Sequence, residues 1–406
     1  MADFYQTGVV ATLHRLGNPD IRKIESELQS YAQDRPMALI LPSLYSELQG
    51  KALAGILTEL QHATYISEVV VTLGPATEDE FKHARQFFSA LPQKTVIIWN
   101  SGPRVSAIYD AVREAELPIG EVGKGRSVWM AFGYILSRQN FKAIALHDCD
   151  IVTYDRSLLP RLCYPVMSPN LDYDFCKGFY SRVTDRLHGR VTRLLVTPLV
   201  RSLSRILGEH PLLTFFDSFR YPLAGEFSMD IDLARINRIP GDWGLEVGVL
   251  AEVFRNTSLR RVCQVDIADV YEHKHQALSP EDLGKGLNKM SVDISKSLFR
   301  TLASEGIVFS DGFFKTLMAT YVQVAQEMLK RYEDDAAING LFFDRHAESL
   351  AVETFTNGIR TAAEIITNDP LGVPLIASWN RVTAAIPNVL DLICSAVMEN
   401  NALAPC

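Results

Sequence analysis

The sequence lacks the features of secreted proteins, of membrane-spanning proteins and of proteins stabilised by a structural zinc site. Its six cysteines are scattered, and none forms a Cys-x-x-Cys pair or a Cys/His cluster with zinc-site spacing. The first residues do not have the charged and then apolar layout of a signal peptide, and no apolar run approaches the ~20 residues of a membrane span. We therefore expect a protein of the reducing cytoplasm that does not bind a membrane.

Other absences narrow the function. The formal net charge is −8, so the chain lacks the basic excess of most nucleic-acid-binding proteins. It also contains no Walker phosphate loop, no dinucleotide fingerprint and no Gly-x-Ser-x-Gly nucleophile elbow. Its 406 residues, 47% hydrophobic and 22% charged, are those of an ordinary globular protein with room for two to three domains.

Short apolar runs alternate with helical patterns through the first part of the chain. The runs predict buried strands at 37–42, 68–73, 94–99 and 142–147, and the helical patterns lie at 49–62, after a cap at Thr77 with Glu80, and at 125–138. This alternation is typical of βαβ units and a parallel sheet. Ligands bind such sheets beyond the carboxyl ends of the strands.

The pattern changes after residue 150. We expect strands at 173–180 and 260–268 and helices at 193–206 and 243–256. From about residue 279 only helical periodicity remains, with breaks near 310–312, 339–340 and 368–370. The chain should thus be an α/β protein whose C-terminal region is helical.

The segment Asp148-Cys149-Asp150 follows the apolar run at 142–147. In an extended segment, residues two apart point the same way. Two carboxylates at a strand end suit magnesium or manganese, which can neutralise a departing diphosphate. A solvated acidic turn is the alternative.

Three further motifs have anion-binding or acid–base character. Gly123-Lys-Gly125 combines a close-approaching backbone with a compact cation, and Gly189-Arg-Val-Thr192 offers guanidinium, hydroxyl and N–H donors at a helix start. Pro222-Leu-Ala-Gly-Glu226 places a carboxylate after a permissive glycine. His273, in Tyr-Glu-His-Lys-His after a predicted strand, is a candidate metal ligand. Each motif alone is also compatible with an ordinary surface loop.

Taken in order, these motifs resemble the glucosyl-3-phosphoglycerate synthase family of retaining GT-A glycosyltransferases. The matching segments, which span roughly residues 37–280, are Leu41-Pro-Ser-Leu-Tyr-Ser-Glu47, Gly123–Gly125, Asp148–Asp150, Gly189–Thr192, Pro222–Glu226, Trp243-Gly-Leu-Glu-Val-Gly248 and the His273 segment. The resemblance implies a GT-A Rossmann-like fold with a mixed, mainly parallel sheet. It also implies glucose transfer from a nucleoside diphosphate donor, preferably UDP-glucose, to the 2-hydroxyl of 3-phosphoglycerate, on the way to the compatible solute glucosylglycerate.

The resemblance also implies a role for each motif. Donor binding falls to Pro42, Ser43, Leu44, Glu47, Gly74, Lys124, Asp148, Cys149 and Leu223. Acceptor binding falls to Gly189, Arg190, Val191, Thr192, Ala224, Gly225, Lys274 and His275. Asp150 and His273 would bind Mg²⁺ or Mn²⁺, and Glu226 and Asp148 would serve catalysis.

These roles define four expected segments. They are a helical lead-in at 1–36, a nucleotide-sugar-binding half at 37–150, an acceptor-binding half at 151–278 and a helical region at 279–406 that forms a homodimer. The segments depart from the family pattern at Cys149, at Leu73-Gly-Pro75 and at Tyr45-Ser46, where relatives carry Ser, Asp-Ser-Gly and Asn-Glu. Donor base and sugar therefore stay open.

Four alternatives also stay open. Two are close variants: a synthase that uses a mannose donor, and one that glycosylates glycerate directly. The third is a sugar-phosphate nucleotidyltransferase, although the first loop lacks that class's basic, glycine-rich signature. The fourth is a non-catalytic protein that binds a nucleotide sugar.

Overall fold

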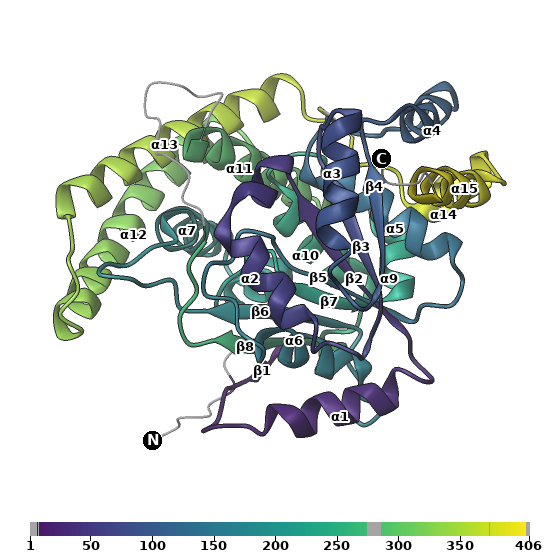
Figure 1. The fold of residues 1–406 in the computed structure, drawn as a ribbon. Helices are drawn as coiled ribbons and strands as arrows, with labels where there is room; N and C mark the ends of the chain where they lie inside the picture. Colours follow the sequence, from purple (N-terminus) through teal and green to yellow (C-terminus); the bar gives the residue numbers. More distant parts are fainter. Residues whose placement is uncertain (1–5, 7, 274–285, 373, 403–406) are drawn as a thin grey trace.

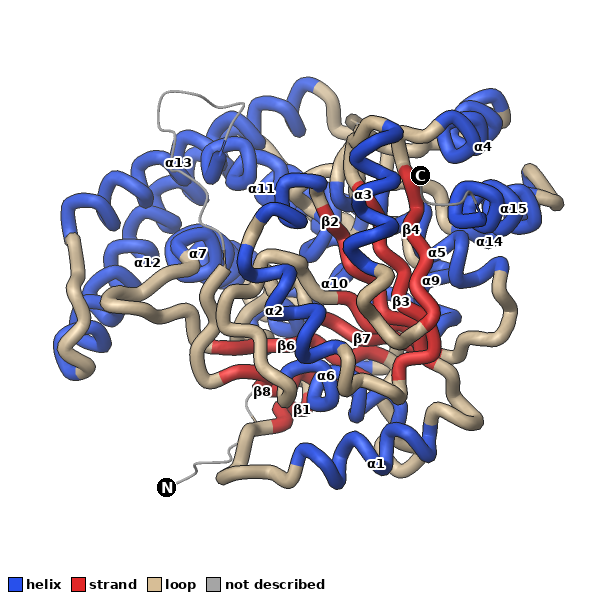
Figure 2. The backbone as a smooth tube through the Cα atoms, viewed as in Figure 1, coloured by secondary structure: helices blue, strands red, loops and turns tan. Residues whose placement is uncertain are grey.

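The computed structural model describes residue 6 and residues 8–273, 286–372 and 374–402. An eight-stranded sheet runs through its centre in the order β1-β8-β6-β7-β5-β2-β3-β4 (Figure 2). The strands are β1 (Ala11–Leu13), β2 (Met37–Ser43), β3 (Ile66–Leu73), β4 (Lys94–Trp99), β5 (Ala143–Leu146), β6 (Phe175–Tyr180), β7 (Phe227–Asp230) and β8 (Val262–Ala268). Only β7 runs antiparallel to its neighbours, β5 and β6. The predicted mixed, mainly parallel sheet is confirmed.

Alternate residues of the central strands feed two cores, one on each face of the sheet. In β2, Met37, Leu39 and Leu41 join one core, whereas Ala38 and Ile40 join the other. Such two-sided burial explains why these strands are continuous apolar runs. One face is covered by α1 (Ile21–Tyr31), α2 (Lys51–Leu60), α3 (Glu78–Phe88) and α6 (Leu158–Met167). The other is covered by α4 (Pro103–Glu114), α5 (Lys124–Ser137), α9 (Ile231–Ile236) and α10 (Leu245–Asn256).

Most predicted elements are present with small shifts at their ends. The predicted cap of α3 is confirmed, since Thr77 and Glu80 form a reciprocal capping box. The predicted helix at 193–206 begins earlier, as a π-helical turn, η2 (Val191–Val196), that continues into α7 (Thr197–Leu207). The predicted helical lead-in at 1–36 contains α1, and it also contains β1, which pairs in parallel with β8. A three-residue strand is too short to show a period-two pattern.

The C-terminal region is helical, as predicted. It contains α11 (Gly286–Ser304), α12 (Asp311–Ile338), α13 (Arg345–Asn368), α14 (Trp379–Ala385) and α15 (Val389–Ala402). Helices α11 to α13 pack together beside α7, whereas α14 and α15 lie on the other side of the molecule, beside α4 and α5 (Figure 1). Nothing in one chain tests the predicted homodimer, which stays a prediction.

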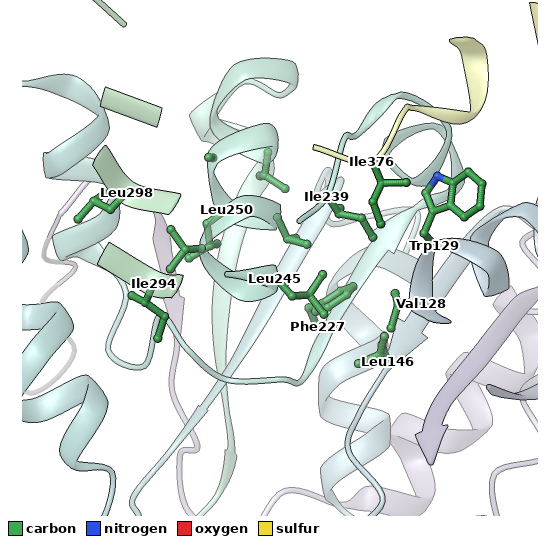
Figure 3. Close-up of a cluster of buried hydrophobic side chains, with 14 of the residues drawn as sticks. Val128, Trp129, Leu146, Phe227, Ile239, Leu245, Leu250, Ile294, Leu298 and Ile376 are labelled. Atoms are coloured by element: carbon green, nitrogen blue, oxygen red, sulfur yellow. The ribbon is translucent and has the colours of Figure 1, made fainter. Parts of the chain in front are cut away.

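The C-terminal segments share the core of the sheet. Figure 3 shows one cluster built from α5, β5, β7, α10, α11 and two loops, with Val128, Trp129, Leu146, Phe227, Ile239, Leu245, Leu250, Ile294, Leu298 and Ile376 labelled. Trp379 of α14 stacks on Trp129 with ring centroids 4.1 Å apart. Each indole N–H also donates to a backbone carbonyl of the other segment, at 2.8 and 3.0 Å. The two tryptophans therefore fasten α14 to α5.

Helix α15 covers the edge strand β4. The side chain of Asn401 accepts a hydrogen bond from the Ile97 N–H at 3.0 Å and donates one to the Ile97 carbonyl at 2.9 Å. The Asn401 amide thus satisfies the backbone N–H and carbonyl of Ile97, which have no neighbouring strand to pair with at this edge. Within the described ranges no single helix has the length and apolar composition to cross a membrane; α14 and α15 pass that test only as a pair bent by 102°. The cytoplasmic location stays a prediction.

Candidate functional site

Lys124 and Asp148 form an ion pair beyond the end of β5. Nζ of Lys124, the first residue of α5, lies 2.6 Å from Oδ1 of Asp148 and 3.3 Å from Oε1 of Glu246 on α10. Burial opposes the charge of Lys124, but these carboxylates outweigh burial and raise its pKa. Burial likewise opposes the charge of Asp148, yet the ammonium group holds the pKa of Asp148 below its ordinary value. Both groups are therefore charged at neutral pH.

Asp150 and His273 meet at the same edge of the sheet. Residues 151 and 273 form an isolated antiparallel bridge, which brings the segment after β8 beside the acidic triplet. Oδ1 of Asp150 is buried, has no hydrogen-bond partner among the described residues and lies 3.6 Å from Nδ1 of His273. Among the described residues no group of three or more His, Cys, Asp or Glu side chains has the arrangement of a metal site. The protein thus offers two adjacent ligand atoms here, one oxygen and one nitrogen.

The predicted donor-binding residues at the ends of β2 and β3 lie on the same side of the sheet, beyond the carboxyl ends of the strands. The Gly74 N–H donates to the Ser43 carbonyl at 2.8 Å, and a Cβ on Gly74 would come within 2.8 Å of the Leu44 side chain. Pro42 lies at the end of β2, and Glu47 lies in the short helix η1 (Tyr45–Gln49) that follows. Leu44 is 53% exposed, so an apolar side chain faces solvent beside these loops.

Cys149 occupies the centre of the acidic triplet and is buried. Burial raises the pKa of its thiol, and the carboxylates of Asp148 and Asp150 raise it further. Burial and the neighbouring carboxylates therefore favour the neutral thiol over the nucleophilic thiolate.

Glu226 is enclosed by two stacked tyrosines. Its carboxylate accepts hydrogen bonds from the hydroxyls of Tyr180, at 2.8 Å, and Tyr271, at 2.5 Å. The two rings are nearly parallel, with centroids 3.6 Å apart. Burial, with a smaller contribution from Asp148, raises the pKa of Glu226. Both of its oxygens are occupied by protein donors, which favours a supporting role over direct contact with a substrate.

The loop before Glu226 packs directly on Asp148. A Cβ on Gly225 would lie only 2.6 Å from Oδ2 of Asp148, so glycine allows the loop to close onto the carboxylate. Nζ of Lys177, on β6, donates to the Ala224 carbonyl at 2.5 Å. Burial lowers the pKa of Lys177 to about 8. Leu223, at the start of this loop, packs against the core.

The loop Gly189–Thr192 forms a second part of the site. Gly189 has a φ of +71°, and a Cβ there would approach the Tyr221 hydroxyl to 3.0 Å. The Tyr221 ring lies against Tyr180, with centroids 5.0 Å apart, which connects this loop to the tyrosines around Glu226. Arg190 donates from Nε to Oε1 of Glu348, on α13, at 2.7 Å. Val191 and Thr192 are buried at the start of η2.

The structure therefore unites the predicted residues after β2, β3, β5 and β8 and links them to the Gly189 loop. The predicted acceptor residues Lys274 and His275 lie outside the described residues. Sequence reasoning missed Lys177, Tyr180, Glu246 and Glu348, which hold the predicted residues in place. Glu246 lies within the Trp243–Gly248 motif, and Lys177 interrupts an apolar strand. These two sequence features were the signals that could have identified Glu246 and Lys177.

A shallow depression at the opposite edge of the sheet contains none of these residues. It is lined by segments that precede β6 and β8, with Asp172, Tyr173, Arg260 and Arg261 among its residues. In open α/β sheets ligands bind beyond the carboxyl ends of the strands. We therefore place the site at the Asp148 edge, where the charged groups converge.

Two curated relatives match nearly the whole chain. A glucosyl-3-phosphoglycerate synthase from Persephonella marina is 48% identical over 401 residues, which cover 99% of each chain. The chain belongs to the glucosyl-3-phosphoglycerate synthase family. A second family member, from Methanococcoides burtonii, is 37% identical over 403 residues and 98% of each chain. No protein-family model matches the chain. The family resemblance predicted from the ordered motifs is thus confirmed, and with it the assignment as a glycosyltransferase.

A solved structure supports the same fold. The glucosyl-3-phosphoglycerate synthase of Mycobacterium tuberculosis, in complex with Mn²⁺, UDP-glucose and phosphoglyceric acid, aligns with a TM-score of 0.53 at 22% identity. The alignment covers 74% of this chain and 89% of the mycobacterial one. The predicted GT-A fold with an added helical C-terminal region is confirmed.

Proposed function

We propose that this family member transfers glucose from UDP-glucose to the 2-hydroxyl of 3-phosphoglycerate, with retention of configuration and with a divalent cation. The product, glucosyl-3-phosphoglycerate, would serve the synthesis of glucosylglycerate. The observation that carries the proposal is the convergence of Lys124, Asp148, Asp150 and His273 at one sheet edge. The names of the full-length relatives and the ligands of the mycobacterial complex agree with it.

The residues at this edge fit a divalent cation. The buried Oδ1 of Asp150 has no hydrogen-bond partner in the part of the chain that the structure describes, and the ring nitrogen of His273 lies beside it. The carboxylate oxygen suits Mg²⁺ or Mn²⁺, the imidazole nitrogen would be the second protein ligand, and the diphosphate of the donor would supply further oxygens. When bound there, the cation neutralises charge on the departing diphosphate.

The other residues bind and orient the substrates. The charged Lys124, the first residue of a helix, is paired with Asp148 and Glu246 and would direct its third ammonium N–H to the donor diphosphate. Asp148, held by Lys124 and by the Gly225 loop, faces the ribose or the donor sugar. The guanidinium of Arg190 and the hydroxyl of Thr192 bind the acceptor phosphate, which supplies proximity.

Neither Asp148 nor Glu226 offers a free carboxylate that could act as the nucleophile of a two-step retaining mechanism. Asp148 is engaged with Lys124, and both oxygens of Glu226 are engaged with tyrosines. Retaining enzymes that form a covalent intermediate need a free carboxylate next to the reacting carbon. We therefore favour a front-face route in which an oxygen of the leaving phosphate takes the acceptor proton.

A matrix of donors and acceptors tests the proposal. The purified protein is incubated with UDP-, GDP- and ADP-glucose or GDP-mannose, with 3-phosphoglycerate or glycerate, and with Mg²⁺ or Mn²⁺. The expected product is α-linked glucosyl-3-phosphoglycerate by NMR. Mannose transfer, or glycerate preferred over 3-phosphoglycerate, would replace the proposed substrates by those alternatives. Pyrophosphate release from a nucleoside triphosphate and a sugar phosphate would support the nucleotidyltransferase. Tight UDP-glucose binding without any transfer would support a non-catalytic binding protein.

A further inference from the structure

A carboxylate of the C-terminal region is buried against the acceptor loop. Oε1 of Glu348, on α13, accepts from Nε of Arg190 at 2.7 Å, and Oε2 accepts from Nη2 of Arg193 at 2.9 Å. Glu348 is 4% exposed and Arg193 is 9% exposed. One carboxylate thus holds two arginines through separate oxygens, which fixes both guanidinium groups relative to α13.

This pairing leaves other donors of the loop unused. Glu348 engages Nε of Arg190, and among the described residues the two terminal nitrogens of Arg190 make no hydrogen bond. The Thr192 hydroxyl and Nη1 of Arg193 are buried and have no hydrogen-bond partner in the described part of the chain. A phosphate carries enough acceptor oxygens to satisfy several such donors at once.

Helix α12 supports the same loop from the neighbouring side. The Tyr321 hydroxyl donates to the Leu194 carbonyl, inside η2, at 2.6 Å. The Arg193 guanidinium lies over the Tyr332 ring, 4.9 Å from its centroid. A π-helical turn has looser backbone hydrogen bonding than an α-helix and is common at functional sites. The C-terminal helices therefore hold both the backbone and the arginines of the acceptor loop.

We propose that Glu348 is a positioning residue that sets the selectivity for a phosphorylated acceptor. This inference rests on the proposed function. By holding Nε, Glu348 presents the terminal nitrogens of Arg190 as a fixed pair of donors that matches two phosphate oxygens. It also balances one of the two positive charges of the half-buried Arg190 and the buried Arg193, so that the loop without a ligand does not hold two unpaired cations.

The opposite role for Glu348 would be that of a competitor, which the acceptor phosphate displaces from the arginines. In that case Glu348 would leave the arginines whenever acceptor binds. The carboxylate is buried and bonded to two arginines, so its release would leave a charge in the interior without a partner. The geometry therefore favours a fixed clamp, and the two roles predict opposite effects of substitution.

The test compares E348Q and E348A with E353A, which changes an exposed glutamate of the same helix. For E348A we expect the KM for 3-phosphoglycerate to rise by about tenfold to a hundredfold, as misplaced binding groups do. The donor KM and kcat should stay within about twofold. The preference for 3-phosphoglycerate over glycerate should fall by the same factor. E348Q, which keeps one acceptor oxygen, should be intermediate, and E353A should match the wild type.

Other results would overturn the inference. An unchanged or lower KM for 3-phosphoglycerate would do so, and a lower one would identify a competitor. An equal rise for both acceptors, or a rise shared with the donor KM, would indicate general loss of structure. Thermal unfolding checks the fold, and E348Q carries the test where E348A does not fold. If the wild type transfers no sugar, the proposed function fails. In that case the affinity for 3-phosphoglycerate is measured by calorimetry in the presence of UDP and Mn²⁺. The comparison of the same variants with the wild type then decides the role of Glu348.

Discussion

Nδ1 of His273 lies 3.6 Å from Oδ1 of Asp150, although the two residues are carried by segments that follow different strands, β8 and β5. Because parallel strands end at a common edge, residues distant in the sequence become neighbours there. The pair is the most direct target for testing the metal proposal.

Asp150→Asn should abolish metal-dependent transfer while leaving the fold intact. Removing one of two protein ligands should lower kcat/KM by about a hundredfold or more, since a bound cation supplies several kcal/mol of transition-state stabilisation. Activity against Mn²⁺ concentration and calorimetric Mn²⁺ binding in the presence of UDP provide the measurement. Asp172→Asn, at a carboxylate with 86% of its side chain exposed, is the control. Wild-type activity in Asp150→Asn with Mn²⁺ present would remove Asp150 from the metal site.

Arg190→Ala should act on the acceptor and leave the donor alone. Loss of the guanidinium removes hydrogen bonds to the acceptor phosphate, so the KM for 3-phosphoglycerate should rise by about tenfold or more. Steady-state kinetics with each substrate varied in turn separate the two KM values. Arg186→Ala, at an exposed arginine three residues before the Gly189–Thr192 loop, should behave as the wild type. An unchanged acceptor KM in Arg190→Ala would place the phosphate elsewhere.

His147 should make the protein acid-sensitive. The imidazole is fully buried between the Asp148 carbonyl and the Tyr154 hydroxyl, and burial lowers its pKa from 6.5 to about 4. The unfolded chain therefore binds a proton that the folded chain does not. This contribution to stability is present above pH 6.5 and is lost as the pH falls towards 4, by about 3 kcal/mol in total.

The measurement is urea unfolding between pH 4 and pH 7. The free energy of unfolding of His147→Gln should depend less steeply on pH over this window than that of the wild type. His62→Gln, on the surface, should keep the wild-type slope. Equal slopes for His147→Gln and the wild type would show that another group controls acid stability.

Asn401→Ala should destabilise the edge of the sheet. The substitution removes two hydrogen bonds to β4 and leaves the N–H and carbonyl of Ile97 without partners. The expected loss is about 1–3 kcal/mol of unfolding free energy, together with increased self-association through the uncovered edge. Asn380→Ala, at an exposed position of α14, is the matched control. Chemical denaturation and light scattering report the two effects.

How much of this could be predicted depended on the range of the interactions. The strand at 94–99 follows from a local apolar run, and the cap at Thr77 from a spacing of three residues. The acidic triplet was recognisable because it follows such a run. By contrast, β7 is only four residues long and depends on two neighbouring strands for its hydrogen bonds. No local pattern distinguishes it from a loop.

The supporting residues of the site were hidden for the same reason. Glu348 is one glutamate on an amphipathic helix, and its partner Arg190 is 158 residues away in the sequence. Lys177 occurs within an apolar strand, where its buried contact with the Ala224 carbonyl could not be foreseen. Motif reading therefore finds the groups that face the ligand, whereas the groups that hold them become visible only when distant segments meet.

The stacking of Trp379 on Trp129 has a consequence for the order of events during synthesis. A ribosome makes α5 long before α14, so a growing chain carries Trp129, and with it one face of the helix that begins at Lys124, without its cover. Domains fold as units once their sequence has emerged. Trp129 therefore gains its aromatic cover only after α14 leaves the exit tunnel, and a growing chain that lacks α14 exposes this aromatic surface.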